Sequence, residues 1–270
     1  MTRDIGPDDA AALMPELTAI VARACAAILR LGVAPHRAKA DGSPVTDEDE
    51  ASEAILLEGL GSLLPGVPVV AEESVARGQT VEIGRTFVLV DPLDGTKEYI
   101  AGRDEYTVNV ALISAATPMA GIVAAPARKC LWRGVVGRGA ERLAIEGERP
   151  LVPEPVGVRP WPASGAVALV SRSHRDAATE ALLQKLAPSA VESCGSSLKF
   201  CRVTEGTADI YPRLGATSEW DIGAGHAVLA AAGGIVTDPG GRPLTYGHPH
   251  GGFRVSGFIA WGDPTKARAI

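Results

Sequence analysis

The segment Asp91-Pro92-Leu93-Asp94-Gly95-Thr96 constrains the fold of this chain more than any other. It follows an apolar run at residues 86–90, rich in β-branched and aromatic residues, that predicts a buried strand. Pro92 cannot donate to a central ladder, so we expect the strand to end at Asp91. Gly95 permits a tight turn, and Thr96 can begin a short helix. The carboxylates of Asp91 and Asp94 are therefore expected at the carboxyl end of a strand.

This placement indicates a ligand site. Ligands bind at the carboxyl ends of strands in α/β sheets, and the amino end of a helix presents free N–H groups to a phosphate. Two carboxylates directed at one point repel each other unless a cation joins them, and oxygen ligands favour a hard cation such as Mg²⁺. Taken alone, the segment is explained equally well by a turn in which an Asp caps the helix.

A second acidic element precedes this segment. Residues 67–71 form another apolar run that predicts a strand, and this run ends in Glu72-Glu73-Ser74. Two successive strands that each end in an acidic pair favour a shared metal site over two unrelated turns.

These two elements and a third one resemble the inositol monophosphatase superfamily of Mg²⁺-dependent, Li⁺-sensitive phosphomonoesterases. The third element is Trp220-Asp221-Ile222-Gly223-Ala224-Gly225. The resemblance runs in the family's order from Lys39 to the segment at 252–256. It implies a sandwich of α+β or α/β type with layers in the order αβαβα.

The remaining patterns predict how the elements are arranged. Helices are expected at about 9–31 and 47–64, and strands at 105–113, 119–125 and 129–136 indicate a largely antiparallel sheet in the first half. The second half alternates strands with helices up to a helix at 220–232, which favours a mixed sheet that contains parallel strands. Residues 146–164 contain five prolines and are the best candidate for a linker. We therefore predict an N-terminal α+β domain at 1–150 and a C-terminal α/β domain at 151–270.

The resemblance implies two Mg²⁺ ions. One would be held by Glu72, Asp91 and the main-chain oxygen of Leu93, and the second by Asp91, Asp94 and Asp221. Some family members bind a further, weaker ion beside the position of Glu73. For Asp221 the alternative is a capping box with Ser218.

The resemblance also implies hydrolysis by a metal-activated water. Thr96, with Asp49 behind it and Glu72 beside the metal, would orient and deprotonate that water. For Asp49 the alternative is a capping box with Thr46 at the start of the second helix, and both roles can hold if Asp49 points into the cleft. The neighbouring Asp47 and Glu48 depart from the small apolar residues that are common there in relatives.

Substrate preference is suggested by four segments, 94–100, 171–174, 195–200 and 211–213, which are similar to the 3'(2'),5'-bisphosphate nucleotidase branch of the superfamily. Enzymes of that branch remove the 3'-phosphate of adenosine 3',5'-bisphosphate, and 3'-phosphoadenosine 5'-phosphosulfate is a further candidate substrate. Lys199 and Arg213 would contact the remaining phosphate. The alternatives are a solvated helix face for Lys199 and a turn position for His174. The predicted substrate contacts are Leu93, Asp94, Gly95, Thr96, His174, Ser196, Lys199, Arg213 and Asp221.

Two other functions remain open at this point. One is an inositol or sugar phosphate phosphatase with the same metal site, in which no second phosphate meets Lys199 and Arg213. The other is a non-catalytic sensor of phosphorylated nucleotides, which would be free to lose Thr96 or a metal carboxylate.

Bulk properties exclude some partners. The formal charge of −6 argues against a nucleic-acid polymer. The four cysteines are scattered and predict reduced, buried thiols. The amino terminus lacks a signal-peptide pattern, and no apolar run approaches the ~20 residues of a membrane span. We therefore expect a cytoplasmic monomer or homodimer without an integral membrane segment, with peripheral contact to the inner membrane left open.

Overall fold

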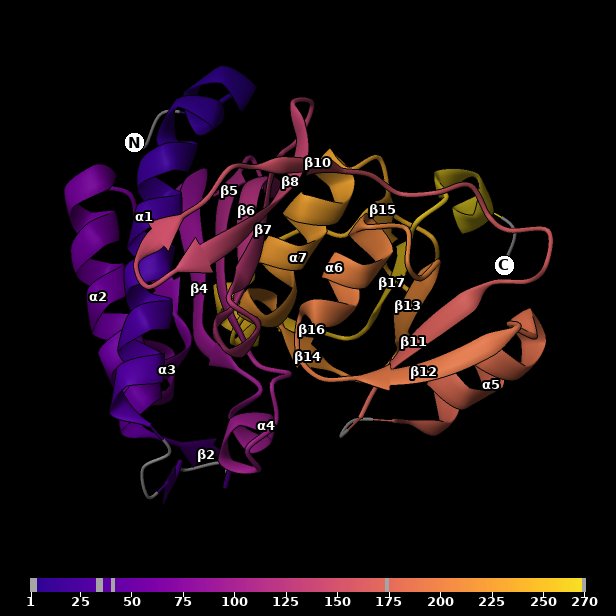
Figure 1. Cartoon of the computed structure of the whole chain (residues 1–270), viewed down its shortest axis with the longest axis horizontal. Coiled ribbons are helices and arrows are strands. Elements are labelled where there is room, and N and C mark those ends of the chain that lie inside the picture. The colour runs from indigo at the N-terminus through magenta and orange to yellow at the C-terminus, as the bar shows by residue number, and fades with distance from the viewer. Residues whose placement is uncertain (1–3, 33–35, 40–41, 173–174, 269–270) are drawn as a thin grey trace.

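The computed structural model describes residues 4–32, 36–39, 42–172 and 175–268. These residues form five layers (Figure 1). Helices α1 (Pro7–Leu31) and α2 (Asp47–Leu63) cover the outer face of the first sheet, and α6 (Leu198–Thr204) and α7 (Glu219–Ala231) lie between the two sheets. Helix α5 (Ala177–Leu186) covers the far face of the second sheet. The predicted αβαβα sandwich is confirmed.

The first sheet has the strand order β10-β8-β7-β6-β5-β4-β3, with β9 paired to β8. All neighbours are antiparallel except β3 and β4, which are parallel, so the prediction of a largely antiparallel sheet is correct. The strands are β3 (Val69–Ala71), β4 (Thr86–Asp94), β5 (Thr107–Ser114), β6 (Thr117–Ala125), β7 (Cys130–Val135), β8 (Gly139–Glu146), β9 (Arg149–Pro150) and β10 (Glu154–Val156).

The second sheet has the order β12-β11-β13-β17-β15. Strand β11 is parallel to β12 and β13, whereas β17 is antiparallel to β13 and β15, which confirms the mixed sheet. Two small two-stranded sheets complete the structure, β1 with β2 and β14 with β16. The strands are β1 (Arg37–Ala38), β2 (Pro44–Val45), β11 (Val167–Ser171), β12 (Ala190–Cys194), β13 (Ile210–Arg213), β14 (Thr217–Ser218), β15 (Ile235–Thr237), β16 (Arg254–Val255) and β17 (Phe258–Trp261).

The linker prediction for residues 146–164 is partly wrong. Strands β9 and β10 lie within this segment and both pair with β8, because prolines are tolerated on edge strands. Within this segment, helix and strand are absent at residues 147–148 and 151–153 and from residue 157 onward. A short helix, α3 (Glu72–Ala76), follows β3 directly and contains the acidic pair Glu72-Glu73. The division into domains at 150/151 stays a prediction.

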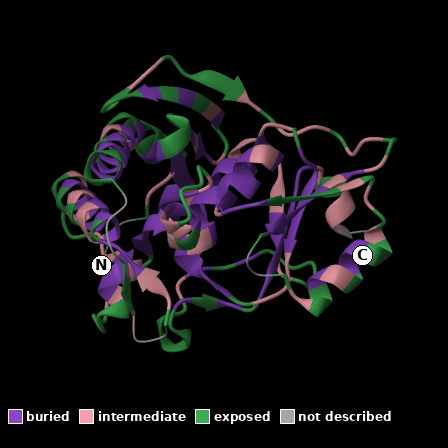
Figure 2. Cartoon of the chain, turned by 60° about the horizontal axis from the view of Figure 1, so that its bottom comes forward, coloured by how far each residue is buried: buried purple, intermediate pink, exposed green. Residues whose placement is uncertain are grey.

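Helix α7 comes from the second half of the chain but packs tightly on the first sheet. A Cβ atom at Gly121 of β6 would lie 2.5 Å from the main-chain oxygen of Ala224, so the helix can approach only because this position is glycine. Leu89, Val228 and Phe258 belong to one buried cluster that joins both sheets. Figure 2 shows the helices between the sheets as almost wholly buried. This packing brings the first turn of α7 to the carboxyl ends of β3 and β4.

Within the described residues one helix, α1, is long and apolar enough to cross a membrane, contrary to the expectation from sequence. Its most apolar 18-residue window is 61% buried inside the protein, where it packs against α2 and the first sheet. Such burial is typical of a core helix. The four cysteines are buried and unpaired, as predicted.

Candidate active site

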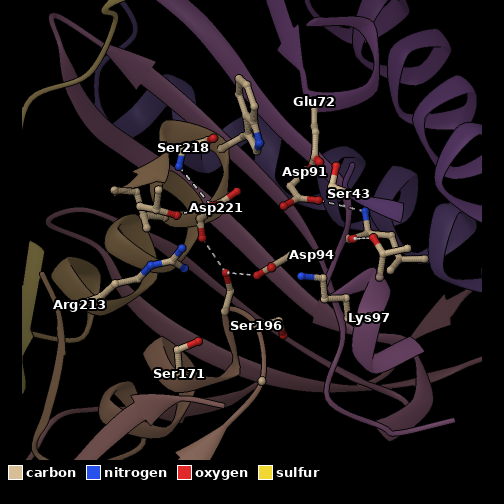
Figure 3. A pocket seen from close by; sticks show the side chains of 18 of the residues that line it. Ser43, Glu72, Asp91, Asp94, Lys97, Ser171, Ser196, Arg213, Ser218 and Asp221 are labelled. Carbon is tan, nitrogen blue, oxygen red and sulfur yellow. Dashed lines mark hydrogen bonds between the residues drawn. The ribbon is translucent and has the colours of Figure 1, made fainter. Parts of the chain in front are cut away.

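Three carboxylates from distant parts of the chain meet at the carboxyl ends of β3 and β4 (Figure 3). Ala71 of β3 pairs with Val90 of β4, so the residues that follow them, Glu72 and Asp91, are neighbours. Asp221 lies in the first turn of α7. Each of the three offers an oxygen, and these oxygens all lie within 4.8 Å of one another. The structure therefore brings together the acidic residues of all three sequence motifs.

The prediction that the strand ends at Asp91 is wrong, because β4 continues to Asp94 by shifting its pairing with β5 between these two residues, past Pro92. Asp94 lines the same pocket. Its Oδ2 atom accepts a hydrogen bond from Ser197 Oγ at 3.0 Å, and Asn109 Nδ2 lies 3.5 Å from the same oxygen. Ser197 Oγ is also 2.7 Å from the main-chain oxygen of Asp221. Ser197 thus bridges two predicted metal ligands, a role that the sequence did not reveal.

The charged forms of these acids are disfavoured in the protein alone. Burial, together with the charges of Asp221 and Glu73, raises the pKa of Glu72 to about 8 against the opposing effect of Lys39. Burial and Asp221 raise the pKa of Asp94 to about 6. Burial and neighbouring carboxylates raise the pKa of Asp91 well above its ordinary value. A set of hard oxygen donors that needs positive charge fits a divalent cation such as Mg²⁺.

Lys39 is the protein's own cation at this cluster. Its ammonium nitrogen lies 2.7 Å from Glu72 Oε1 and 2.6 Å from Glu73 Oε1. Although burial opposes its charge, the two carboxylates raise the pKa of Lys39. The pKa values of Glu72, Asp91 and Asp94 stay raised even with Lys39 and the other cations of the pocket nearby, so these carboxylates still favour a bound cation.

Asp49 makes both contacts that the sequence allowed. Its Oδ2 accepts hydrogen bonds from Thr46 N at 2.8 Å and Thr46 Oγ1 at 2.6 Å, which confirms the capping box of α2. Its Oδ1 accepts a bond from Thr96 Oγ1 at 3.2 Å, and Leu93 O lies 3.3 Å from the same hydroxyl. Burial raises the pKa of Asp49 despite the Thr46 hydrogen bonds. Asp221 combines roles in the same way, since it completes the capping box of Ser218 while facing the acidic cluster.

The two acidic residues before Asp49 differ from each other. Asp47 is exposed and pairs with Arg37 at 3.0 Å. Glu48 is fully buried, and neither of its carboxylate oxygens has a hydrogen-bond partner within the described part of the chain.

These groups line a pocket of about 470 Å³, a size typical of small-molecule sites. Gly95 is in the left-handed region at φ 95°, and a Cβ atom there would lie 3.1 Å from the main-chain oxygen of Glu105. His174 lies outside the described residues, and Asp49 stands behind Thr96. The other predicted site residues all line the pocket, namely Glu72, Asp91, Leu93, Asp94, Gly95, Thr96, Ser196, Lys199, Arg213 and Asp221.

Lys199 does not lie on a solvated helix face. Its side chain is buried, and its ammonium nitrogen lies 3.0 Å from Cys194 O and 2.6 Å from Ser196 O. It also lies 4.9 Å from the centre of the Tyr211 ring, a cation–π contact. By contrast, the guanidinium of Arg213 is directed into the pocket, toward Asp221 (Figure 3).

Several residues of the pocket were not predicted from sequence. Lys97 follows Thr96, and its ammonium is directed toward Asp94 from the wall opposite Arg213 (Figure 3). Arg254 of β16 lines the pocket beside Ser218. Lys97 lies in the segment 94–100 and Arg254 in the segment at 252–256, and both segments carry the family resemblance, so both residues could have been found from the sequence.

Comparison with known proteins decides the family. Residues 12–258 match the inositol monophosphatase family. This chain belongs to the inositol monophosphatase family. The 3'(2'),5'-bisphosphate nucleotidase CysQ of Escherichia coli K12 is 43% identical over 223 residues, which cover 81% of this chain and 87% of that protein. The CysQ of Salmonella typhimurium LT2 is 41% identical over 221 residues, or 82% of this chain and 86% of that protein.

Solved structures agree with the family assignment. The crystal structure of CysQ from Bacteroides thetaiotaomicron superposes with a TM-score of 0.75 at 33% identity, covering 92% of this chain and 97% of that one. The inositol monophosphatase from Anabaena superposes with a TM-score of 0.74 at 25% identity, covering 97% and 96%. Both structures therefore share the five-layered fold over almost its whole length.

Proposed function

We propose that this protein is a Mg²⁺-dependent 3'(2'),5'-bisphosphate nucleotidase that converts adenosine 3',5'-bisphosphate and water to AMP and phosphate. The observation that carries this proposal is the meeting of Glu72, Asp91 and Asp221 in front of the Thr96–Asp49 pair. The similarity to curated CysQ nucleotidases supports the choice of substrate. By the same chemistry, 3'-phosphoadenosine 5'-phosphosulfate is a second candidate substrate.

Two Mg²⁺ ions would be held by the acids of the pocket. Glu72, Asp91 and the main-chain oxygen of Leu93 would hold one, and Asp91, Asp94 and Asp221 the other. Bound Mg²⁺ supplies Lewis-acid stabilisation of the phosphoryl oxygens. Because Mg²⁺ prefers oxygen ligands, the donor set suits it.

The Thr96–Asp49 pair would orient and deprotonate the attacking water. The Thr96 hydroxyl donates to Asp49 Oδ1 at 3.2 Å, which leaves the hydroxyl oxygen able to accept the proton of a water beside Glu72. As the new P–O bond forms, the water proton passes to Thr96 and the Thr96 proton passes to Asp49. A carboxylate whose pKa is raised by burial is better suited to take up that proton. The P–O bond to the ribose 3'-oxygen breaks, and that oxygen leaves with a proton from solvent.

The rest of the pocket would position the nucleotide. We propose that the N–H groups of Gly95 and Thr96 contact the reacting phosphate, while Ser196, His174 and Arg213 contact the remainder of the substrate. Lys199 would position the loop that carries Ser196 in the pocket wall, since its ammonium is already bound to two carbonyl oxygens. A cytoplasmic location and the oligomeric state stay predictions.

The principal alternative is a phosphatase of inositol or sugar phosphates. It shares the fold and the acidic cluster, so the metal site cannot separate the two functions. Arg213 separates them in principle, because an inositol monophosphate has no second anionic group to meet it. A non-catalytic sensor would not need the Thr96–Asp49 contact that this chain retains.

The experiment that tests the proposal measures phosphate release with Mg²⁺ from a panel of substrates. The panel contains adenosine 3',5'-bisphosphate, adenosine 2',5'-bisphosphate, inositol 1-phosphate, fructose 1,6-bisphosphate and AMP. We expect the two adenosine bisphosphates to have the highest kcat/KM and AMP to be inert. A preference for inositol 1-phosphate would establish the alternative, and no release from any substrate would favour the sensor.

A further inference from the structure

We propose that Arg254 is a specificity-determining residue, which together with Arg213 binds the phosphate that is not hydrolysed. This inference rests on the proposed function and extends it to a residue that was not among the predicted substrate contacts. It begins from the cations that line the pocket, namely Lys39, Lys97, Lys199, Arg213 and Arg254.

Two of these cations are already committed within the protein. Lys39 is bound to Glu72 and Glu73 at 2.7 and 2.6 Å. Lys199 is bound to the main-chain oxygens of Cys194 and Ser196 and lies over the Tyr211 ring. An ammonium with two acceptors and an aromatic face has little capacity left for a phosphate, because it has only three N–H groups. Lys199 therefore fits a residue that positions the loop carrying Ser196.

The other three cations make no ion pair with a carboxylate in the described part of the chain. Lys97 is directed toward Asp94 from the wall opposite Arg213 (Figure 3). Arg213 and Arg254, in contrast, both contact the segment 216–218. Arg213 donates to Ala216 O at 3.3 Å, and Arg254 donates to Ser218 Oγ at 3.3 Å.

The contacts of both arginines lie on one short segment of the pocket wall. Ala216 and Ser218 are two residues apart, so this segment holds Arg213 and Arg254 beside the same part of the pocket. A phosphate bound there could accept charge-assisted hydrogen bonds from both guanidinium groups. Strand pairing fixes the arrangement, since Arg254 of β16 is the register partner of Ser218 of β14.

The charge and the hydrogen bonding of the two arginines also favour a bound anion. Two guanidinium groups on one wall repel each other, and an anion between them removes that repulsion. Arg213 Nε is buried and has no hydrogen-bond partner among the described residues, so this N–H still lacks an acceptor. A guanidinium presents its N–H groups in a planar fork that matches phosphate oxygens.

The test uses two inhibitors that separate the subsites. AMP, the product, retains the second phosphate, whereas inorganic phosphate competes for the reacting subsite alone. For Arg254→Gln we expect KM for adenosine 3',5'-bisphosphate and Ki for AMP to rise about 10- to 100-fold, the usual effect of losing a charge-assisted contact. The Ki for inorganic phosphate and kcat should stay close to the parent values.

Two further variants control the comparison. Arg149→Gln removes a charge from an exposed position on β9, outside the pocket, and should change neither Ki. Arg254→Lys keeps the charge but not the fork, so a partial rise in Ki for AMP is expected even if Arg254→Gln fails to fold. An unchanged Ki for AMP, or an equal rise for AMP and inorganic phosphate, would overturn the inference. Failure of the parent protein to hydrolyse any bisphosphate would instead overturn the proposed function.

Discussion

Replacing Asp49 by Asn separates the capping role of this residue from its proposed chemical role. In the parent protein Oδ2 accepts from Thr46 N and Thr46 Oγ1 at 2.8 and 2.6 Å, and Oδ1 accepts from Thr96 Oγ1 at 3.2 Å. The amide oxygen of Asn can accept both bonds from Thr46. Its nitrogen then faces the Thr96 hydroxyl, and this nitrogen cannot accept a proton.

The two roles predict effects of different size. Asn and Asp are nearly equal as caps, so the free energy of unfolding should change by less than about 1 kcal/mol. A change of that size moves Tm by roughly 2–4 °C for a chain near 250 residues. Loss of general-base assistance should lower kcat by about 10²–10⁴-fold.

The assay measures thermal unfolding and steady-state phosphate release on the same preparation, with saturating Mg²⁺. Thr96→Ala should lower kcat by a similar factor, and the double variant should lose little more, because the two residues act as a unit. A clear drop in Tm with kcat preserved would refute the reasoning. Asp49 would then be a cap only, and the attacking water would need no Thr96–Asp49 pair.

Three other predictions follow from the contacts in the pocket. Ser197→Ala removes the bridge between Asp94 and the main-chain oxygen of Asp221, so calorimetry should show a Mg²⁺ affinity about 10- to 100-fold lower. Ser62→Ala, at an exposed position, is the control, and an equal Mg²⁺ affinity in both variants would show that the Ser197 bridge does not support metal binding. In the chelated protein the pKa values of Glu72 and Asp94 are raised to about 8 and about 6, so the folded state keeps protons on these carboxyl groups at pH values where the unfolded chain has released them. The stability of the chelated protein should therefore fall as pH rises from about 5 to about 8, and bound Mg²⁺ should remove most of this fall. A Tm that rises with pH in calorimetric scans would contradict this prediction. Lys199→Met should raise Ki for AMP and for inorganic phosphate together, because it loosens the loop that carries Ser196 and Ser197, whereas a selective rise for AMP would return Lys199 to the second-phosphate subsite.

Features set by local chemistry could be predicted from the sequence. The apolar run before Asp91 and the capping boxes of Thr46 and Ser218 depend on residues close in the chain, and the structure contains all three. The dual position of Asp49 could be anticipated because a first-turn carboxylate can face both its cap and a neighbouring strand end.

Features set by distant packing could not be predicted in this way. The proline-rich segment that forms β9 and β10 was predicted to be a linker, because pairing at the edge of a sheet leaves no periodic pattern in the sequence. Lys199 looks like an ordinary helix residue until the Gly195 loop folds over it and supplies two carbonyl oxygens. Ser197 and Arg254 acquire roles only when the second half of the chain meets β4 and α7.

The central claim is that four carboxylates hold the Mg²⁺ on which hydrolysis depends. The most direct measurement titrates Mg²⁺ into chelated protein and follows, in parallel, the heat of binding and the rate of phosphate release from adenosine 3',5'-bisphosphate. We predict no release before Mg²⁺ is added and a rate that rises with Mg²⁺ occupancy, whereas Asp91→Asn should lose both signals. Undiminished phosphate release from the chelated protein would contradict the account.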